Sequence, residues 1–279
     1  MARKENQVVL ITGCSSGIGR ALAREFAASG HRVVATARRL ESIEDLGDDS
    51  TQILQLDVTD EHSVENAVKN AYALNGRIDI VVNNAGYALI GPVAEIELED
   101  LRTQLETNVV GVVAMIRAVV PHMVERSGGR IVNIGSVSGV TATPFGGAYC
   151  GSKAAIHLIS DALRMEMAPF GIQVIEVQPG AIESSFGERA SKAIDRYRKG
   201  SLYSQIYDAI EARAGASQEG SMPAAKFARR VVEAVTASSP PAIFRAGKHS
   251  VRLPVIGLLP VRLRDRIFSK RFGLERFSK

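Results

Sequence analysis

The chain has 279 residues, of which 46% are apolar and 23% are charged, and its formal net charge is +4. These values fit one large globular domain with a full hydrophobic core and exclude an intrinsically disordered chain. The two cysteines, Cys14 and Cys150, give neither a zinc-type spacing nor a disulfide framework, so we predict no metal site and a reducing, cytoplasmic location.

The sequence also bears on membranes and secretion. Apolar runs such as Val8–Ile11 and Ile78–Val82 are too short to span a bilayer. The first residues lead directly into one of these runs and leave no room for the apolar region of a signal peptide. We therefore expect neither a membrane-spanning segment nor a secretory leader.

Short runs of β-branched residues alternate with segments of helical periodicity. In one such segment apolar residues recur at Val64, Ala67, Val68 and Ala71, which is the spacing of one helix face. The strand-like runs are Gln7–Thr12, Arg32–Thr36, Gln52–Leu56, Ile78–Asn83, Arg130–Gly135, Gln173–Gln178 and Ala242–Arg245. Strands that are apolar throughout and separated by helices indicate a parallel sheet covered on both faces. The predicted fold class is α/β, a doubly wound (Rossmann) parallel sheet with a C-terminal helical extension.

A glycine-rich turn, Thr12-Gly13-Cys14-Ser15-Ser16-Gly17-Ile18-Gly19, joins the first strand to a helix. Glycines let the backbone turn tightly and approach a pyrophosphate, and free N–H groups at the helix N-terminus face the anion. A glycine-rich turn alone is weak evidence, but this one lies at the strand–turn–helix junction that the mechanism requires. We predict that Gly13, Ser15, Ser16, Gly17, Ile18 and Gly19 bind a dinucleotide.

The end of the second strand bears on the choice of dinucleotide. An acid at this place would accept a hydrogen bond from the 2′-hydroxyl of the adenosine ribose, but the sequence here is Ala37-Arg38-Arg39. A guanidinium suits a 2′-phosphate by charge and by bidentate geometry. Arg38 therefore predicts NADP(H) rather than NAD(H), whereas Arg39 is expected to be a solvated turn residue.

Several polar residues are expected to converge on the crevice at the carboxyl ends of the strands. Asn84, Ala85 and Gly86 follow the fourth strand, Asn108 lies in the next helix, and Ser136 ends the fifth strand. Tyr149 and Lys153 are four residues apart, so they share one face of a helix. A neighbouring ammonium and a cationic nicotinamide ring would lower the pKa of the tyrosine and make it an acid/base group, while Ser136 would bind the substrate oxygen.

These motifs together resemble the short-chain dehydrogenase/reductase family over residues 7 to about 185. The family pattern reads T-G-x-x-x-G-x-G, N-N-A-G, and an active site of Asn, Ser and Y-x-x-x-K. The resemblance implies that Tyr149 is the acid/base, that Lys153 binds the nicotinamide ribose and lowers the tyrosine pKa, that Ser136 binds substrate, and that Asn108 orders a water beside Lys153.

The resemblance also implies the remaining cofactor contacts. Asp57 and Val58 would meet the adenine, and Pro179 and Gly180 would form the nicotinamide-binding turn, with Ile182 beside it. Ser184 stands where many members carry a threonine that touches the carboxamide, so it is expected to substitute for that residue.

The region after that turn bears on the substrate. Residues 184 to about 220 are polar and break the strand–helix rhythm, which suits a substrate loop. The motifs are most similar to the hydroxysteroid and retinol dehydrogenase and acyl-dihydroxyacetone phosphate reductase branch, which implies a small apolar carbonyl or alcohol substrate. We expect a catalytic domain at 1–247 and a basic amphipathic extension at 248–279.

The extension is basic and two-faced. Residues 244–279 hold ten Lys or Arg against Asp265 and Glu275. In a helix over 260–274, Val261, Phe268 and Phe272 share one face and Leu263, Ile267 and Leu274 the other. One face can pack on the domain, and the second then needs another subunit of a homodimer or homotetramer, an anionic lipid surface, or the substrate mouth. A helix wedged inside the domain is the alternative. No nucleic-acid motif is present, so no nucleic-acid partner is expected.

The sequence leaves two other functions open. One is a catalytically idle NADP(H)-binding sensor or scaffold, which would have no reason to keep Tyr149, Lys153, Ser136 and Asn108 together. The other is a nucleotide-sugar epimerase or dehydratase, which needs a larger substrate domain than the residues after Gly180 readily supply.

Overall fold

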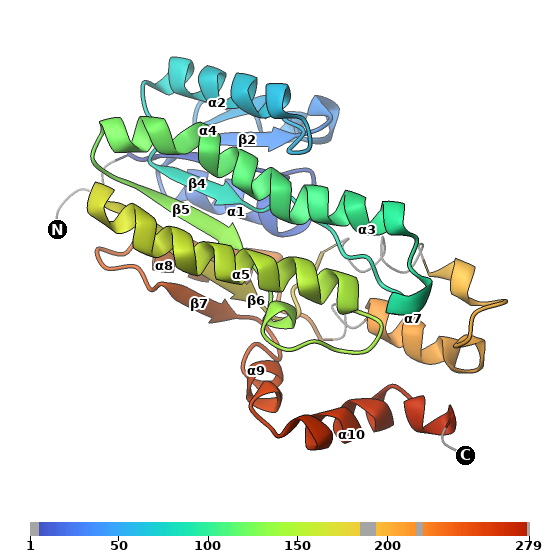
Figure 1. Ribbon diagram of the computed structural model, residues 1–279. Coiled ribbons are helices and arrows are strands. Elements are labelled where there is room, and N and C mark those ends of the chain that lie inside the picture. The colour runs from blue at the N-terminus through green and yellow to red at the C-terminus, as the bar shows by residue number, and fades with distance from the viewer. Residues whose placement is uncertain (1–5, 185–193, 216–219, 278–279) are drawn as a thin grey trace.

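The computed structural model describes residues 6–184, 194–215 and 220–277. Its centre is a single seven-stranded sheet in which every strand pair is parallel and the strand order is β3-β2-β1-β4-β5-β6-β7 (Figure 1). The strands are β1 (Val8–Ile11), β2 (Arg32–Ala37), β3 (Thr51–Gln55), β4 (Ile80–Asn83), β5 (Gly129–Ile134), β6 (Ile172–Pro179) and β7 (Ile243–Ala246). All seven predicted strands are present, and the doubly wound α/β fold is confirmed.

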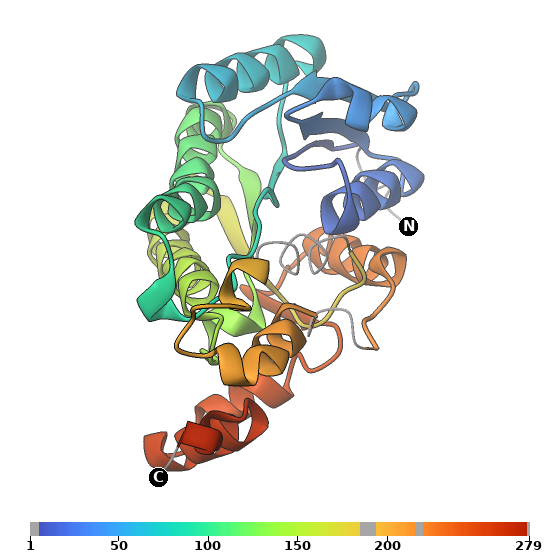
Figure 2. The same cartoon turned by 90° about the vertical axis from the view of Figure 1, so that its right-hand side faces the viewer.

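Helices cover both faces of this sheet, as Figures 1 and 2 show. The helices are α1 (Gly17–Ala28), α2 (Glu61–Asn75), α3 (Leu98–Leu105), α4 (Gly111–Glu125), α5 (Gly147–Met167), α7 (Tyr207–Gly215), α8 (Ala224–Val235), α9 (Arg252–Gly257) and α10 (Val261–Arg271). Helices α1 and α8 pack on one face, and α2, α4 and α5 pack on the other. Their ends follow from local chemistry: α2 begins after Asp60, whose carboxylate accepts from the Ser63 N–H, and ends at Gly76 with φ +67°.

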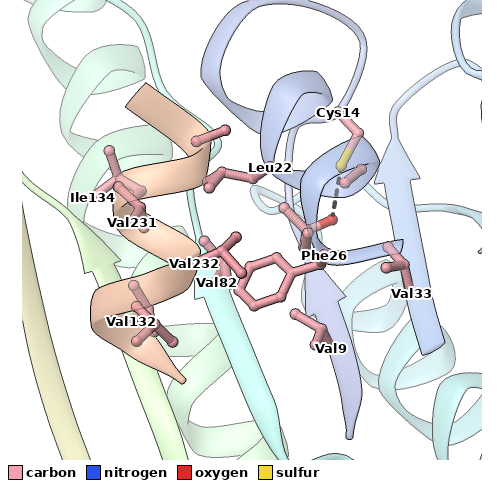
Figure 3. Close-up of a cluster of buried hydrophobic side chains, with 14 of the residues drawn as sticks. Val9, Cys14, Leu22, Phe26, Val33, Val82, Val132, Ile134, Val231 and Val232 are labelled. Atoms are coloured by element: carbon pink, nitrogen blue, oxygen red, sulfur yellow. Dashed lines mark hydrogen bonds between the residues drawn. The ribbon is translucent and has the colours of Figure 1, made fainter. Parts of the chain in front are cut away.

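The strand pattern explains why there are two cores. Along β1, Val9 and Ile11 point to the α1/α8 face, whereas Val8 and Leu10 point to the other face, and all four are buried. Figure 3 shows the first core, where Phe26 of α1 lies between strand residues and the valines of α8. Because Phe26 is fully buried, its replacement by alanine would cost about 3–5 kcal/mol of unfolding free energy.

The helical stretch Leu98–Glu125 corrects one expectation from the sequence. By length and composition it could cross a membrane, because an 18-residue window within it has a mean hydropathy of 1.5, so the apolar segments are not all too short. Met115, Val119 and Met123 of this stretch are fully buried in the second core. Packing against the sheet therefore accounts for part of the high hydropathy, since 39% of that window is buried. Between α3 and α4 the chain forms one π-helical turn, Glu106–Val110, and Asn108 lies in it, fully buried.

Helices α9 and α10 follow β7 and lie at the carboxyl edge of the sheet (Figure 1). Phe268 and Phe272 of this extension are buried in a third cluster that also holds Phe145 and Tyr149. On the other face Leu263 and Ile267 are exposed, as expected from the two-faced pattern. Leu274 was predicted to share that face, but α10 ends at Arg271 and Leu274 packs against the phenylalanine cluster. Val261 was predicted to share the phenylalanine face but is 60% exposed, because it begins the helix outside the cluster.

Candidate active site

A cavity of about 710 Å³ opens at the carboxyl ends of β1, β4, β5 and β6. The strand order reverses between β1 and β4, and ligands of open α/β sheets bind at such a reversal. The predicted site residues that line the cavity are Gly13, Ser15, Ser16, Gly17, Ile18, Arg38, Asp57, Val58, Asn84, Ala85, Gly86, Ser136, Tyr149, Lys153, Pro179, Gly180, Ile182 and Ser184. The fold therefore gathers them in one place, and Gly19 and Asn108 lie just behind the wall.

The glycine-rich turn is braced against the end of β4. The Thr12 hydroxyl accepts from the backbone N–H groups of Asn84 and Ala85, both at 3.0 Å, and the Asn84 amide donates to the Thr12 and Gly13 carbonyls. Gly13 and Gly17 have φ of +74° and +58°, and a Cβ on Gly13 would lie 2.9 Å from the Ala85 Cα. A Cβ on Gly19 would overlap the Asn84 amide. This glycine therefore allows α1 to pack closely against Asn84 and does not itself line the cavity.

The end of the cavity around Arg38 is where the adenosine is predicted to bind, and we call it the adenosine end. It is basic. Arg38 is exposed at the end of β2 and lines both the main cavity and a smaller pocket of about 300 Å³. Ser15, Ala37, Arg39 and Ser42 complete that smaller pocket, so Arg39, expected to be only solvated, faces it too. Two guanidinium groups and two hydroxyls, with no acid among the described lining residues, fit a 2′-phosphate.

The end of the cavity around Ser136 and Tyr149 is where the reaction is predicted to take place, and we call it the reacting end. It is built from the end of β5 and the first turns of α5. Ser136, Tyr149 and Lys153 are all less than 9% exposed. Lys153 donates from Nζ to the Ile134 carbonyl at 2.7 Å, which holds the ammonium beneath the strand end. The Ser136 hydroxyl accepts from the Ser138 N–H at 3.1 Å and hydrogen-bonds the Tyr149 phenol.

Burial dominates the electrostatics of Tyr149 and Lys153 in the protein alone. Burial raises the pKa of Tyr149 to about 12, and the hydrogen bond from Ser136 and the charge of Arg213 oppose this only in part. Burial lowers the pKa of Lys153 to about 8. Desolvation of the charged forms is therefore the main cause of both shifts. The expected lowering of the tyrosine pKa involves the cationic nicotinamide ring as well as Lys153, so it stays a prediction for the complex with cofactor.

Asn108 lies outside the cavity and hydrogen-bonds the backbone of Tyr87, which lines it. Its amide donates to the Tyr87 carbonyl at 2.9 Å and to Ser152 Oγ at 3.0 Å, and its Oδ1 accepts from the Tyr87 N–H at 3.1 Å. A Cβ on Gly86 would lie 3.0 Å from Asn108 Oδ1 and 3.7 Å from Lys153 Nζ. The π-helical turn thus directs the Asn108 side chain to the Tyr87 backbone, close to Lys153. Single π-helical turns are frequent at functional sites.

The predicted nicotinamide turn lies between β6 and the extension. The Gly180 N–H donates to the Ala246 carbonyl at 2.8 Å, and the Ala181 N–H donates to the Lys248 carbonyl at 2.9 Å. Ser184 lies over the phosphate turn, since a Cβ on Gly17 would come 2.9 Å from the Ser184 Cβ. Of the expected substrate loop, residues 185–193 and 216–219 lie outside the described residues.

Comparison with known proteins identifies the fold's family. The short-chain dehydrogenase family matches residues 7–195, more than half of the chain. The chain belongs to the short-chain dehydrogenases.

Two curated relatives show how far this similarity extends. The 3-ketodihydrosphingosine reductase of Bacteroides thetaiotaomicron is 39% identical over 180 residues, which cover 64% of this chain and 65% of that protein. The NADPH-dependent 1-acyldihydroxyacetone phosphate reductase of Schizosaccharomyces pombe is 40% identical over 178 residues, covering 63% and 60%. The similarity thus spans less than two thirds of either relative's length.

Among solved structures, a short-chain dehydrogenase from Streptomyces avermitilis is similar with a TM-score of 0.80 and 32% identity. The match covers 99% of both chains. The similarity to this short-chain dehydrogenase therefore includes the C-terminal extension.

The structure adds residues that the motifs of a short-chain dehydrogenase did not point to. Arg213 of α7, Phe268 of α10 and Phe272, which follows α10, line the reacting end of the cavity. His157, one turn after Lys153 on α5, accepts from the Ser136 N–H at 3.3 Å. For His157 the helical spacing from Lys153 was a usable signal, whereas nothing in the polar stretch around Arg213 marks it.

Proposed function

We propose that this short-chain dehydrogenase is an NADP(H)-dependent enzyme that interconverts a ketone or aldehyde and an alcohol on an apolar substrate. The observation that carries the proposal is the meeting of Ser136, Tyr149 and Lys153 at one end of a cavity whose other end is basic and glycine-rich. A scaffold protein would have no use for three buried polar groups aimed into a cavity.

The cofactor proposal rests on the adenosine end. Gly13 and Gly17 would bring backbone close to the pyrophosphate, Arg38 would bind the 2′-phosphate, and Asp57 and Val58 would meet the adenine. The acyldihydroxyacetone phosphate reductase to which the chain is similar is NADPH-dependent. When bound, the cofactor supplies the hydride that reduces the carbonyl carbon.

Side chains of the protein would bind the substrate oxygen and protonate it. The Ser136 hydroxyl, fixed by the Ser138 N–H, would donate to the carbonyl oxygen, and the Tyr149 phenol would deliver the proton. With its pKa near 12, the phenol carries its proton at neutral pH, which suits the reductive direction. Lys153, held by the Ile134 carbonyl, would hydrogen-bond the nicotinamide ribose, and Asn108 would position the wall and a water beside it.

An apolar substrate is supported by the walls at the reacting end. Leu89, Ile90, Ile256, Phe268 and Phe272 line the cavity there. Two relatives are named as reductases of 3-ketodihydrosphingosine and of an acyl ketone phosphate, which agrees with a lipid-like carbonyl substrate.

We further propose that the protein is cytoplasmic and contacts membranes only at their periphery. The outer face of the extension would bind an anionic lipid surface. Val251, Leu258 and Val261 are 66%, 86% and 60% exposed, and Arg262 is exposed beside them. Sedimentation with anionic vesicles, weakening as salt is added, would support this proposal, and equal sedimentation with neutral vesicles would contradict it.

We also propose a homodimer or homotetramer, which light scattering can test.

The test of the proposed function is an initial-rate assay of NADPH oxidation over a panel of sterol, retinoid and acyl ketones. We expect turnover with NADPH on long apolar ketones and little with NADH. Binding of NADPH without turnover on any carbonyl would favour an idle sensor or scaffold instead. Conversion of a nucleotide-sugar without net NADPH oxidation would favour an epimerase or dehydratase.

A further inference from the structure

The reacting end of the cavity is positively charged as well as apolar. Arg213, Arg252 and Arg271, from α7, α9 and α10, line it beside the phenylalanines. None of these three arginines forms an ion pair with an acid in the described part of the chain. The acids among the described lining residues are Asp57, at the adenosine end, and Asp100. Asp100 is already paired with Arg196 at 2.6 Å, so the excess positive charge is not compensated within the cavity.

Arg213 is the arginine nearest the chemistry. The positive charge of Arg213 acts to lower the pKa of the Tyr149 phenol. A Cβ on Gly146, just before α5, would lie 2.7 Å from the Arg213 Nη2. The side chain is half-buried and held in place, since Nε donates to Thr143 Oγ1 at 2.8 Å. Helix α7 itself is anchored by Ile210 and Ala214, which are buried in the third cluster. Among the described residues, the Arg213 side chain forms this one hydrogen bond, from Nε, so its Nη groups can donate to a ligand beside Tyr149.

We propose that the substrate carries an oxyanion, a carboxylate or a phosphate, near its reacting carbonyl, and that Arg213 binds this group. This inference rests on the proposed reductase function. A half-buried guanidinium facing an uncharged substrate would lose hydration without compensation, whereas an oxyanion provides charge-assisted, bidentate hydrogen bonds. The apolar remainder of such a substrate would lie against Phe268 and Phe272.

The experiment compares substrates that differ by one charge. 3-Hydroxydecanoate and its methyl ester are oxidised with NADP+ by the wild type and by Arg213→Gln, Arg213→Lys and Arg266→Gln. Arg266 is exposed on α10 and is not among the cavity residues, so it is the matched control for loss of one arginine. The ratio of kcat/KM for acid and ester cancels any effect of Arg213 on the Tyr149 pKa, because both substrates use the same tyrosine.

We expect the wild type to prefer the acid and Arg213→Gln to lower the acid-to-ester ratio by at least about tenfold, mainly through KM for the acid. Arg213→Lys should keep part of the preference, because it retains the charge without the planar fork. Arg266→Gln should keep all of it.

A second measurement uses the wild type alone and does not depend on the folding of any variant. Decanoate and decyl phosphate are compared with methyl decanoate as competitive inhibitors of ester oxidation. Tighter inhibition by either anion supports the inference, and the tighter of the two identifies carboxylate or phosphate. The inference is overturned if the neutral ester is preferred and inhibits as well, or if Arg213→Gln leaves the ratio unchanged. Absence of turnover with every substrate would instead overturn the proposed function.

Discussion

The two ends of the cavity are specified in different ways. At the cofactor end, short contiguous motifs set backbone conformations, such as the positive φ of Gly13 and Gly17, and hydrogen bonds accepted by the Thr12 hydroxyl fix the end of β4. At the substrate end, side chains from α7, α9 and α10 meet across long stretches of sequence. A ligand that binds to backbone can be predicted from local sequence, whereas a ligand that binds to scattered side chains cannot.

The largest expected effect is at the junction of the two ends. Tyr149→Phe should lower kcat by about a hundredfold or more, because it removes the proton donor while leaving the ring in the cluster. NADPH affinity, measured by fluorescence titration, should stay nearly unchanged. Near-wild-type turnover in this variant would show that another group delivers the proton.

Behind Ser136, the cofactor side of the molecule contains a buried polar cluster. His157 Nε2 lies 3.1 Å from Glu176 Oε1, and burial lowers the pKa of His157 to about 4, with Lys153 and Arg245 adding to that shift and Asp161 opposing it. Burial also raises the pKa of the Glu176 carboxyl.

This cluster predicts a pH dependence of stability. The unfolded chain protonates His157 near pH 6.5 and the folded chain only near 4, so the unfolded state binds more protons in between and stability falls as the pH decreases. Between pH 7 and 4.5 the loss from this group should be about 2.5 kcal/mol. Urea unfolding at both pH values measures it, and His157→Gln should remove that share. An equal loss in wild type and variant would refute the assignment to His157.

At the substrate end, truncation after Gly247 tests whether the extension is part of the site. It removes Phe268 and Phe272 from the cavity wall but none of the proposed catalytic groups. We expect kcat/KM for long apolar substrates to fall by about twentyfold, with a smaller change for short ones and intact NADPH binding. Circular dichroism and a melting curve are the controls. If the domain unfolds, residues 248–279 are structural and not a separable extension.

The smallest expected effect is at the adenosine end. Arg38→Ser should reduce the preference for NADPH over NADH by about tenfold, since one charge-assisted phosphate contact is worth at least ~1.4 kcal/mol. Calorimetric titration of both dinucleotides measures it, and the unchanged affinity for NADH is the internal control. Equal losses for both would mean that Arg38 does not bind the 2′-phosphate.

Much of the fold and of the cofactor end could be predicted because apolar strand runs and glycine-rich turns are local features. The sequence did not reveal Arg213, since its proximity to Gly146 depends on tertiary folding and no periodicity marks α7. It also missed the membrane-like hydropathy of Leu98–Glu125 and the exposure of Val261. The raised pKa of Tyr149 in the protein alone could not be predicted either, because desolvation depends on burial that only the packed structure shows.

Isotope transfer tests the central claim most directly. The enzyme is incubated with NADPH carrying deuterium at the transferable position of the nicotinamide and with methyl 3-oxodecanoate, and the product alcohol is examined by mass spectrometry. The account predicts one deuterium on the carbon that bears the new hydroxyl, in wild type and, much more slowly, in Tyr149→Phe. Product without deuterium, or tight NADPH binding with no product from any ketone in the panel, would contradict it.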